Sequence, residues 1–203
     1  MTAIRQPYKM SFGVGGLLLN ESIELARQRI GGSSWDAVMA DGIAAGTTSL
    51  PKAQSRRRML REIINRLSSL SSPELEFLVN DADRAEQAAL LWVAACRSYR
   101  FVREFAIEVV CERYLSYEPD LPLEVFDRLL AAKAEWDEGL AVLNRSTALK
   151  LRQILFRMMR EAGIITEKNH IVATYLSPRL VDMVAMSNRS DLAVFPGFSA
   201  ERL

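Results

Sequence analysis

Histidine and cysteine are scarce in this 203-residue sequence, which contains one histidine, His170, and two cysteines. A single histidine cannot supply the ligand spacings of a zinc site or a Ser-His-Asp set, and no nucleophile motif accompanies it. We therefore expect no enzyme activity, no metal site and no other cofactor. Cys96 and Cys111 are fewer than a disulfide framework needs, so we expect reduced thiols in the core.

Long hydrophobic runs are missing as well. The longest uncharged apolar run, Ala88 to Cys96, is far shorter than the roughly 20 residues that a membrane-spanning helix requires. Residues 1–22 contain a short apolar patch, but neither the hydrophobic region nor the cleavage pattern of a signal peptide. We therefore expect a cytoplasmic protein that has no membrane partner.

Acidic residues are absent from residues 145–160, which contain five bases and therefore carry a charge of +5. Residues 52–66 contain six bases and one acid, again +5, whereas residues 74–138 contain 15 acids and 7 bases, a charge of −8. The net charge of +1 thus hides two basic segments on either side of an acidic middle. Such segregation of charge influences the choice of partner more than the net charge does.

Strand-like patterns are rare, and apolar residues mostly recur with helical spacing. We predict helices at about residues 20–30, 35–43, 53–70, 85–98, 101–115, 123–133, 146–162 and 180–186, another that begins at about residue 72, and an irregular tail after Ser187. Only residues 164–165 and 171–176 resemble strands, and a polar turn separates them.

The predicted class is therefore mainly α, a multi-helix protein with a C-terminal winged helix-turn-helix-like segment that carries a short β-hairpin. We divide the chain into three regions. They are an N-terminal helical region with a basic helix (1–72), an acidic helical middle (73–120), and a winged helix-like C-terminal region with a tail (121–203).

The second basic segment forms a helix that we expect Ser146 to cap and Gly163 to end. On a helical wheel, one side collects apolar residues for the core and the other side collects Lys150 and Arg157. The order helix, glycine, short strand, turn, strand is typical of a winged helix, in which the helix before the first strand enters the major groove of DNA. This interpretation predicts that the helix start approaches DNA first, through Arg145, Ser146, Thr147 and Lys150, and that Lys168 lies in the wing.

The first basic segment has the same two-sided pattern. Its arginines lie opposite the apolar residues Met59, Ile63 and Leu67, and guanidinium groups form forked, charge-assisted hydrogen bonds with phosphates. The alternative is that these arginines pair with the acidic middle of the same chain. The complete set of candidate nucleic-acid contacts is Arg56, Arg57, Arg58, Arg61, Arg145, Ser146, Thr147, Lys150, Arg157 and Lys168.

Several phrases of the sequence resemble the BrxA family, small accessory proteins of bacteriophage-exclusion (BREX) defence systems. They are MSFGVGGLLLNESIELA (10–26), REIINRLSSLSSPELEFLV (61–79), LLWVAACRSYRFVREFAIEVVCERY (90–114), KAEWDEGL (133–140) and STALKLRQILFRMMREAGII (146–165). The resemblance covers about residues 10–185. It implies a mostly helical DNA-binding protein without enzymatic activity, which acts beside a methyltransferase, an ATPase and other defence components.

The leading hypothesis is therefore binding of double-stranded DNA in phage defence, with other BREX components as partners. The family has also been compared with the RNA-binding antitermination protein NusB, so RNA binding is one alternative. A protein-interaction adaptor, whose basic helices dock on acidic partners, is the other.

Overall fold

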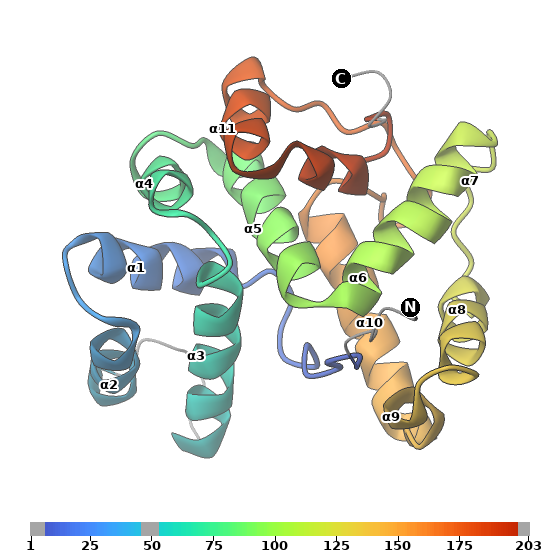
Figure 1. The fold of residues 1–203 in the computed structure, drawn as a ribbon, viewed down its shortest axis with the longest axis horizontal. Coiled ribbons are helices and arrows are strands. Elements are labelled where there is room, and N and C mark those ends of the chain that lie inside the picture. The colour runs from blue at the N-terminus through green and yellow to red at the C-terminus, as the bar shows by residue number, and fades with distance from the viewer. Residues whose placement is uncertain (1–6, 46–52, 199–203) are drawn as a thin grey trace, which may run out of the picture.

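The computed structural model describes residues 7–45 and 53–198, and nearly all of its regular structure is helical (Figure 1). The mainly α class is thus confirmed. The first five helices are α1 (Leu19–Ile30), α2 (Trp35–Ala45), α3 (Ala53–Leu67), α4 (Ser72–Asn80) and α5 (Arg84–Ser98). A continuous helical run then follows, made of α6 (Arg100–Glu104), the π-helix η1 (Phe105–Cys111) and α7 (Glu112–Leu115).

The remaining elements are α8 (Glu124–Ala134), α9 (Glu138–Ala141), α10 (Arg145–Glu161), α11 (Pro178–Asn188) and the 3₁₀-helix η2 (Arg189–Val194). The short helix α9 was not predicted, because a single turn is too short to show helical periodicity. All the helices that the sequence predicted are present, with ends that differ by a few residues.

Helix α5 lies at the centre of the molecule and packs against α3, α4 and η2 (Figure 1). Its apolar run from Ala88 to Cys96 is buried on all sides. Asp83 caps α5 through a capping box with Glu86, and Ser71 caps α4 in the same way with Glu74. These local signals explain why α4 begins at Ser72 and α5 at Arg84.

The C-terminal tail differs from the prediction. We expected irregular structure after Ser187, but η2 follows α11 directly, and Leu192, Val194 and Phe195 are fully buried. The indole N–H of Trp92 donates to the carbonyl of Val194 at 3.3 Å. The sequence did not show this docking because six residues are too few to reveal a period.

Residues 164–172 form a hairpin-like turn that contains isolated bridges. Ile165 pairs with Ile171, and His170 pairs with Asp120. No extended strand forms in the described parts of the chain, and within the expected strand at 171–176 only Ile171 forms a β-bridge. The amide of Thr174 donates to the carbonyl of Pro196 instead, which turns this segment toward the tail. The winged helix-turn-helix-like segment therefore stays a prediction.

A single cluster of buried apolar side chains includes residues from all three predicted regions, among them Leu60, Trp92 and Leu155. The proposed boundaries at 72/73 and 120/121 remain untested. Both cysteines are free and buried, as expected. Among the described residues, no helix has the length and hydropathy needed to cross a membrane.

Candidate nucleic-acid interface

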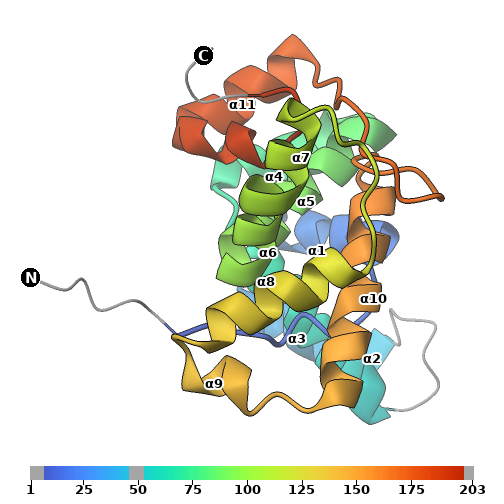
Figure 2. The same cartoon turned by 90° about the vertical axis from the view of Figure 1, so that its right-hand side faces the viewer.

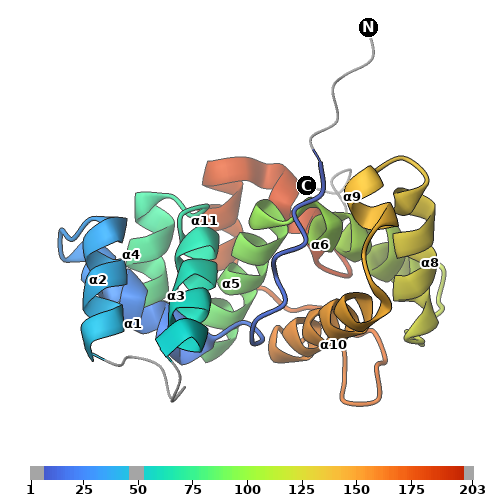
Figure 3. The same cartoon turned by 90° about the horizontal axis from the view of Figure 1, so that it is seen from below.

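A groove of about 710 Å³ lies between α3 and α10. Arg58 and Arg61 line it from α3, and Ser146, Thr147 and Lys150 line it from α10. Figure 3 shows these two helices with the N-terminal segment running between them. The two basic segments of the sequence therefore meet at one surface, which we call the basic groove.

Helix α3 presents its arginines to solvent because its other side belongs to the core. Leu60, Ile63 and Leu67 are fully or almost fully buried, whereas Arg58 and Arg61 are exposed. The spacing of three to four residues between the buried positions leaves the arginines on the opposite side.

Helix α10 follows the same rule, but it begins one residue earlier than predicted. Asn144, not Ser146, is the N-cap, and its side-chain oxygen accepts a hydrogen bond from the amide of Thr147 at 2.8 Å. The Ser146 hydroxyl donates to the same oxygen at 2.8 Å. Ser146 thus lies in the first turn of α10, on the side that faces the groove.

Residues 7–17 lie along the groove and contribute a cation that sequence reasoning missed. Phe12 anchors this segment by packing its ring against Tyr99, at 5.4 Å between centroids. Lys9 lines the groove, hydrogen-bonds through Nζ to Asn65 and lies 5.7 Å from the centre of the Tyr99 ring. An isolated lysine outside any predicted helix gave no signal in the sequence.

The single acid in the groove lining, Glu62, is neutralised within the fold. Arg66 Nε donates to Glu62 Oε1 at 2.6 Å, and the Tyr99 hydroxyl donates to the other oxygen. Arg66 also holds the carbonyl of Gly16 at 2.7 Å, which ties the N-terminal segment to α3. Burial and the neighbouring Glu62 raise the pKa of Tyr99, so this phenol stays protonated. The groove surface is therefore cationic, with Lys9, Arg58, Arg61 and Lys150 around it.

Other bases of α10 have partners within the fold. Arg152 pairs with Asp127, and Arg157 Nε donates to Glu161 at 2.7 Å. Arg160 donates to Asn169 at 2.7 Å. The absence of acids from residues 145–160 thus did not mean the absence of acidic partners.

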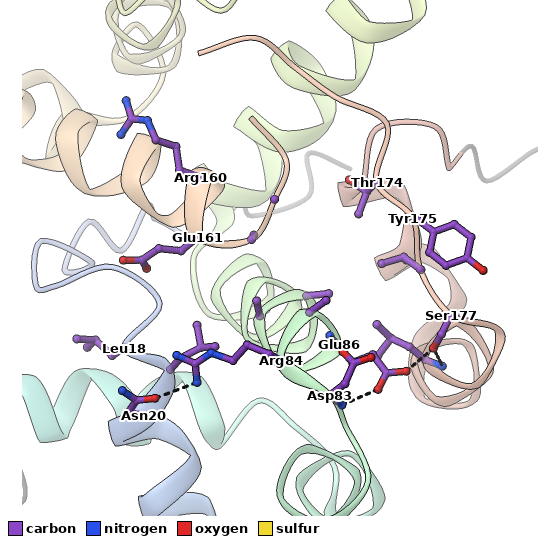
Figure 4. A pocket seen from close by; sticks show the side chains of 18 of the residues that line it. Leu18, Asn20, Asp83, Arg84, Glu86, Arg160, Glu161, Thr174, Tyr175 and Ser177 are labelled. Carbon is purple, nitrogen blue, oxygen red and sulfur yellow. Dashed lines mark hydrogen bonds between the residues drawn. The ribbon is translucent and has the colours of Figure 1, made fainter. Parts of the chain in front are cut away.

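Arg157 does not line the basic groove. It lines a second hollow, which is bounded by α1, α5, the end of α10 and residues 173–177 (Figure 4). Arg84 spans this hollow toward Asn20, and Glu86 lies beside Ser177 (Figure 4). Four acids and three bases line the hollow, so it does not present charge of one sign to a ligand.

The other predicted residues lie outside the groove lining. Arg57 and Arg145 are exposed near its two sides, Lys168 is exposed in the turn at 166–169, and Arg56 is partly buried. Within the described ranges, no carboxylate pairs with Arg57, Arg58, Arg61, Arg145, Lys150 or Lys168. The same ranges contain no group of three or more His, Cys, Asp or Glu side chains that could hold a metal ion.

Comparisons with known proteins give consistent matches. A family model described as BrxA matches residues 6–188. The chain is 28% identical over 164 residues to the BREX protein BrxA of Paramagnetospirillum magneticum, which covers 79% of this chain and 80% of that protein. Its fold is similar to the crystal structure of an uncharacterized protein from Magnetospirillum magneticum, with a TM-score of 0.80, 23% identity and coverage of 94% and 98%.

Proposed function

Because the chain belongs to the BrxA family, it is an accessory protein of a BREX system, and we propose that it binds double-stranded DNA through the basic groove. One observation carries this proposal. Two basic segments separated by an acidic middle meet around one groove, and its single acid already has partners. We propose that the protein acts without catalysis, beside other BREX components.

The groove chemistry favours contacts to the DNA backbone. Arg58 and Arg61 can form forked hydrogen bonds to phosphates, and Lys9 and Lys150 contribute point charges. The start of α10 adds the positive end of its dipole and the hydroxyls of its first turn. Such contacts give most of the affinity and little sequence preference.

The order of elements supports a winged-helix arrangement for this contact. The residue pairs 120/170 and 165/171 bring three chain segments together, and hydrogen bonds connect Leu121 to Asn169 at 2.9 Å and Ile171 to Pro119 at 2.7 Å. Helices α8, α9 and α10 lie between the first and second of these segments. In this arrangement α10 is the recognition helix, and the turn with Lys168 is the wing beside it.

Duplex DNA fits the groove better than single-stranded nucleic acid does. Proteins that bind single strands stack the bases on exposed aromatic rings. The only aromatic residue in the groove lining is Tyr99, and it is fully buried. The deep, narrow major groove of duplex RNA also excludes a helix such as α10.

Fluorescence anisotropy with labelled duplex DNA, single-stranded DNA and an RNA hairpin tests the proposal. Four phosphate contacts give a slope of about −3.6 for log affinity against log salt concentration, so affinity for the duplex falls on the order of 10²-fold between 50 and 200 mM salt. We expect the duplex to bind most tightly. Duplex binding that ignores salt, or an RNA hairpin that displaces the duplex, would contradict the proposal.

A further inference from the structure

Tyr117 occupies a strained backbone position at the end of α7. Its φ is 57°, in the left-handed region, where glycine is favoured. The amide of Tyr117 donates to the carbonyl of Tyr114 at 3.2 Å, and that of Glu118 donates to Arg113 at 2.9 Å. This pair of bonds is the Schellman motif, which commonly has glycine at the position of Tyr117.

The Tyr117 side chain does not offset this strain by burial, because it is 94% exposed. Tyr117 therefore adds backbone strain to the folded chain without any stabilisation from burial of its ring. An exposed tyrosine that does not stabilise the fold is suited to contact another molecule, because it combines an apolar ring with a polar hydroxyl.

The surroundings of Tyr117 form a distinct patch. Leu115 is 56% exposed and Leu123 is 39% exposed. Residues 112–124 contain four acids and one base, and all four acids are exposed. Glu118 pairs with Arg113 at 3.1 Å and Asp120 with His170 at 2.7 Å, so Glu112 and Glu124 are the acids of this segment without an ion-pair partner among the described residues. We call this surface the acidic tip; it consists of Leu115, Tyr117, Leu123, Glu112, Glu118, Asp120 and Glu124. Exposed apolar side chains together with exposed acids within one short segment fit a partner surface that is basic and carries an exposed apolar residue.

The described part of the chain contains such a surface in the basic groove and the adjoining side of α10. Lys150, Arg58 and Arg61 supply the positive charge, and Leu149, 37% exposed, supplies an apolar group beside Lys150. We propose that the acidic tip of one copy docks on the α10 side of the basic groove of a second copy. The chain thereby associates head to tail.

The acidic tip and the basic groove of one chain cannot dock on each other. No residue of the acidic tip lines the groove, and Figure 2 shows the end of α7 near the top of the molecule and the start of α10 near the bottom. Since the two surfaces differ, the contact is heterologous, and further copies can add at each free end. The inference does not depend on DNA binding, although a docked copy and DNA would exclude each other at this groove.

Sedimentation velocity on the full chain at 50 and 500 mM NaCl tests the association. We expect oligomers at low salt and monomers at high salt, because opposite charges at the interface are screened. Tyr117→Gly relieves the backbone strain, so it should melt at or above the temperature of the unmodified chain, yet associate at least about tenfold more weakly. Tyr175→Ser, which removes a tyrosine that is 89% exposed elsewhere, is the matched control and should associate normally.

A mixing experiment distinguishes head-to-tail docking from other contacts. Lys150→Glu disables the groove but leaves the tip intact, and Tyr117→Gly does the reverse. Each variant alone should be monomeric, and a mixture should form dimers and nothing larger. A monomer at every salt concentration, or association that Lys150→Glu leaves unchanged, overturns the inference.

Discussion

Lys150 and Arg157 lie about two turns apart on α10, yet their surroundings differ. Arg157 pairs with Glu161, whereas Lys150 has no carboxylate partner among the described residues and faces the groove. The charge of a side chain therefore does not establish whether it can serve a ligand. At the scale of the residue, a basic side chain is free to bind a ligand only if no acid from a neighbouring turn or element pairs with it, and a helical wheel does not show such pairs.

Glu86 is the opposite case, because side chains of the same fold hydrogen-bond to its carboxylate. Hydrogen bonds from Arg179 lower the pKa of Glu86 to about 2, against the effect of burial and with help from Ser177. Because the folded-state pKa is depressed, the stabilisation is complete above about pH 4.5 and is lost as the pH falls toward 2.

We predict that Arg179→Met lowers the free energy of unfolding at pH 7, because Glu86 then loses the hydrogen bonds that lower its pKa; solvent screening at the half-exposed Arg179 keeps the effect small. The difference from the unmodified chain should shrink steadily between pH 4.5 and pH 2. Urea unfolding at each pH measures it. Arg189→Met, which changes an exposed arginine without a carboxylate partner in the described ranges, should show no such pH dependence.

At the scale of the element, η2 depends on a buried charge cluster. Asp191 is buried and accepts hydrogen bonds from Arg97, at 2.7 Å, and from Arg103. Arg97 also forms a forked pair with Glu74 on α4, with both distances at 2.8 Å. Burial opposes ionisation of Glu74, but hydrogen bonds from Arg97 and Ser71 lower its pKa overall. The tail is thus attached to α5 and α6 by ion pairs as well as by apolar packing, and Arg97 extends this cluster to α4.

We predict that Asp191→Ala destabilises the chain by about 2–4 kcal/mol, because it leaves two partly buried guanidinium groups without this carboxylate. Chemical denaturation measures the change. Asp182→Ala, at an exposed position of α11, is the control and should change stability by less than about 0.5 kcal/mol. Equal effects of the two substitutions would show that the tail does not need the ion pairs.

At the scale of the whole molecule, α3 and α10 act as one surface only because of their packing. The N-terminal segment lies between them and is attached to both sides. Gly16 accepts from Arg66 of α3, and the amide of Leu17 donates to Glu161 of α10. A Cβ on Gly16 would clash with the carboxylate of Glu161, so any larger residue here would force that side chain to move. This crossing holds the two basic helices in a fixed relation.

We predict that Arg61→Glu and Lys150→Glu each weaken DNA binding by at least about tenfold, without changing its stoichiometry, because in the proposed complex one duplex contacts both helices. The double variant should bind more weakly than either single variant. Isothermal titration with a short duplex measures affinity and stoichiometry together.

Arg128→Glu serves as the control, since it reverses an exposed arginine of α8 that does not line the groove. A single variant that keeps full affinity at half the stoichiometry would indicate two independent sites. Circular dichroism should show the same helical content for all the variants.

Local physical rules account for much of what could be predicted. The capping boxes at Ser71 and Asp83, the apolar sides of α3 and α10, and the fully apolar stretch of α5 all follow from residues within a few turns of one another. Helices, their approximate ends, the mainly α class and the family could therefore be read from the chain. The cap of α10 was misplaced because Asn144 and Ser146 are both good N-caps.

Contacts between distant segments could not be read in this way. The pairing of Arg152 with Asp127, the place of Lys9 in the groove and the burial of η2 each join residues from different elements. No period or motif encodes such a pair, since it exists only after the helices have packed. The amino-acid sequence by itself was sufficient to predict an α-helical protein with two basic helices. Packing brought them to one groove, neutralised some of their charges and left the others facing solvent.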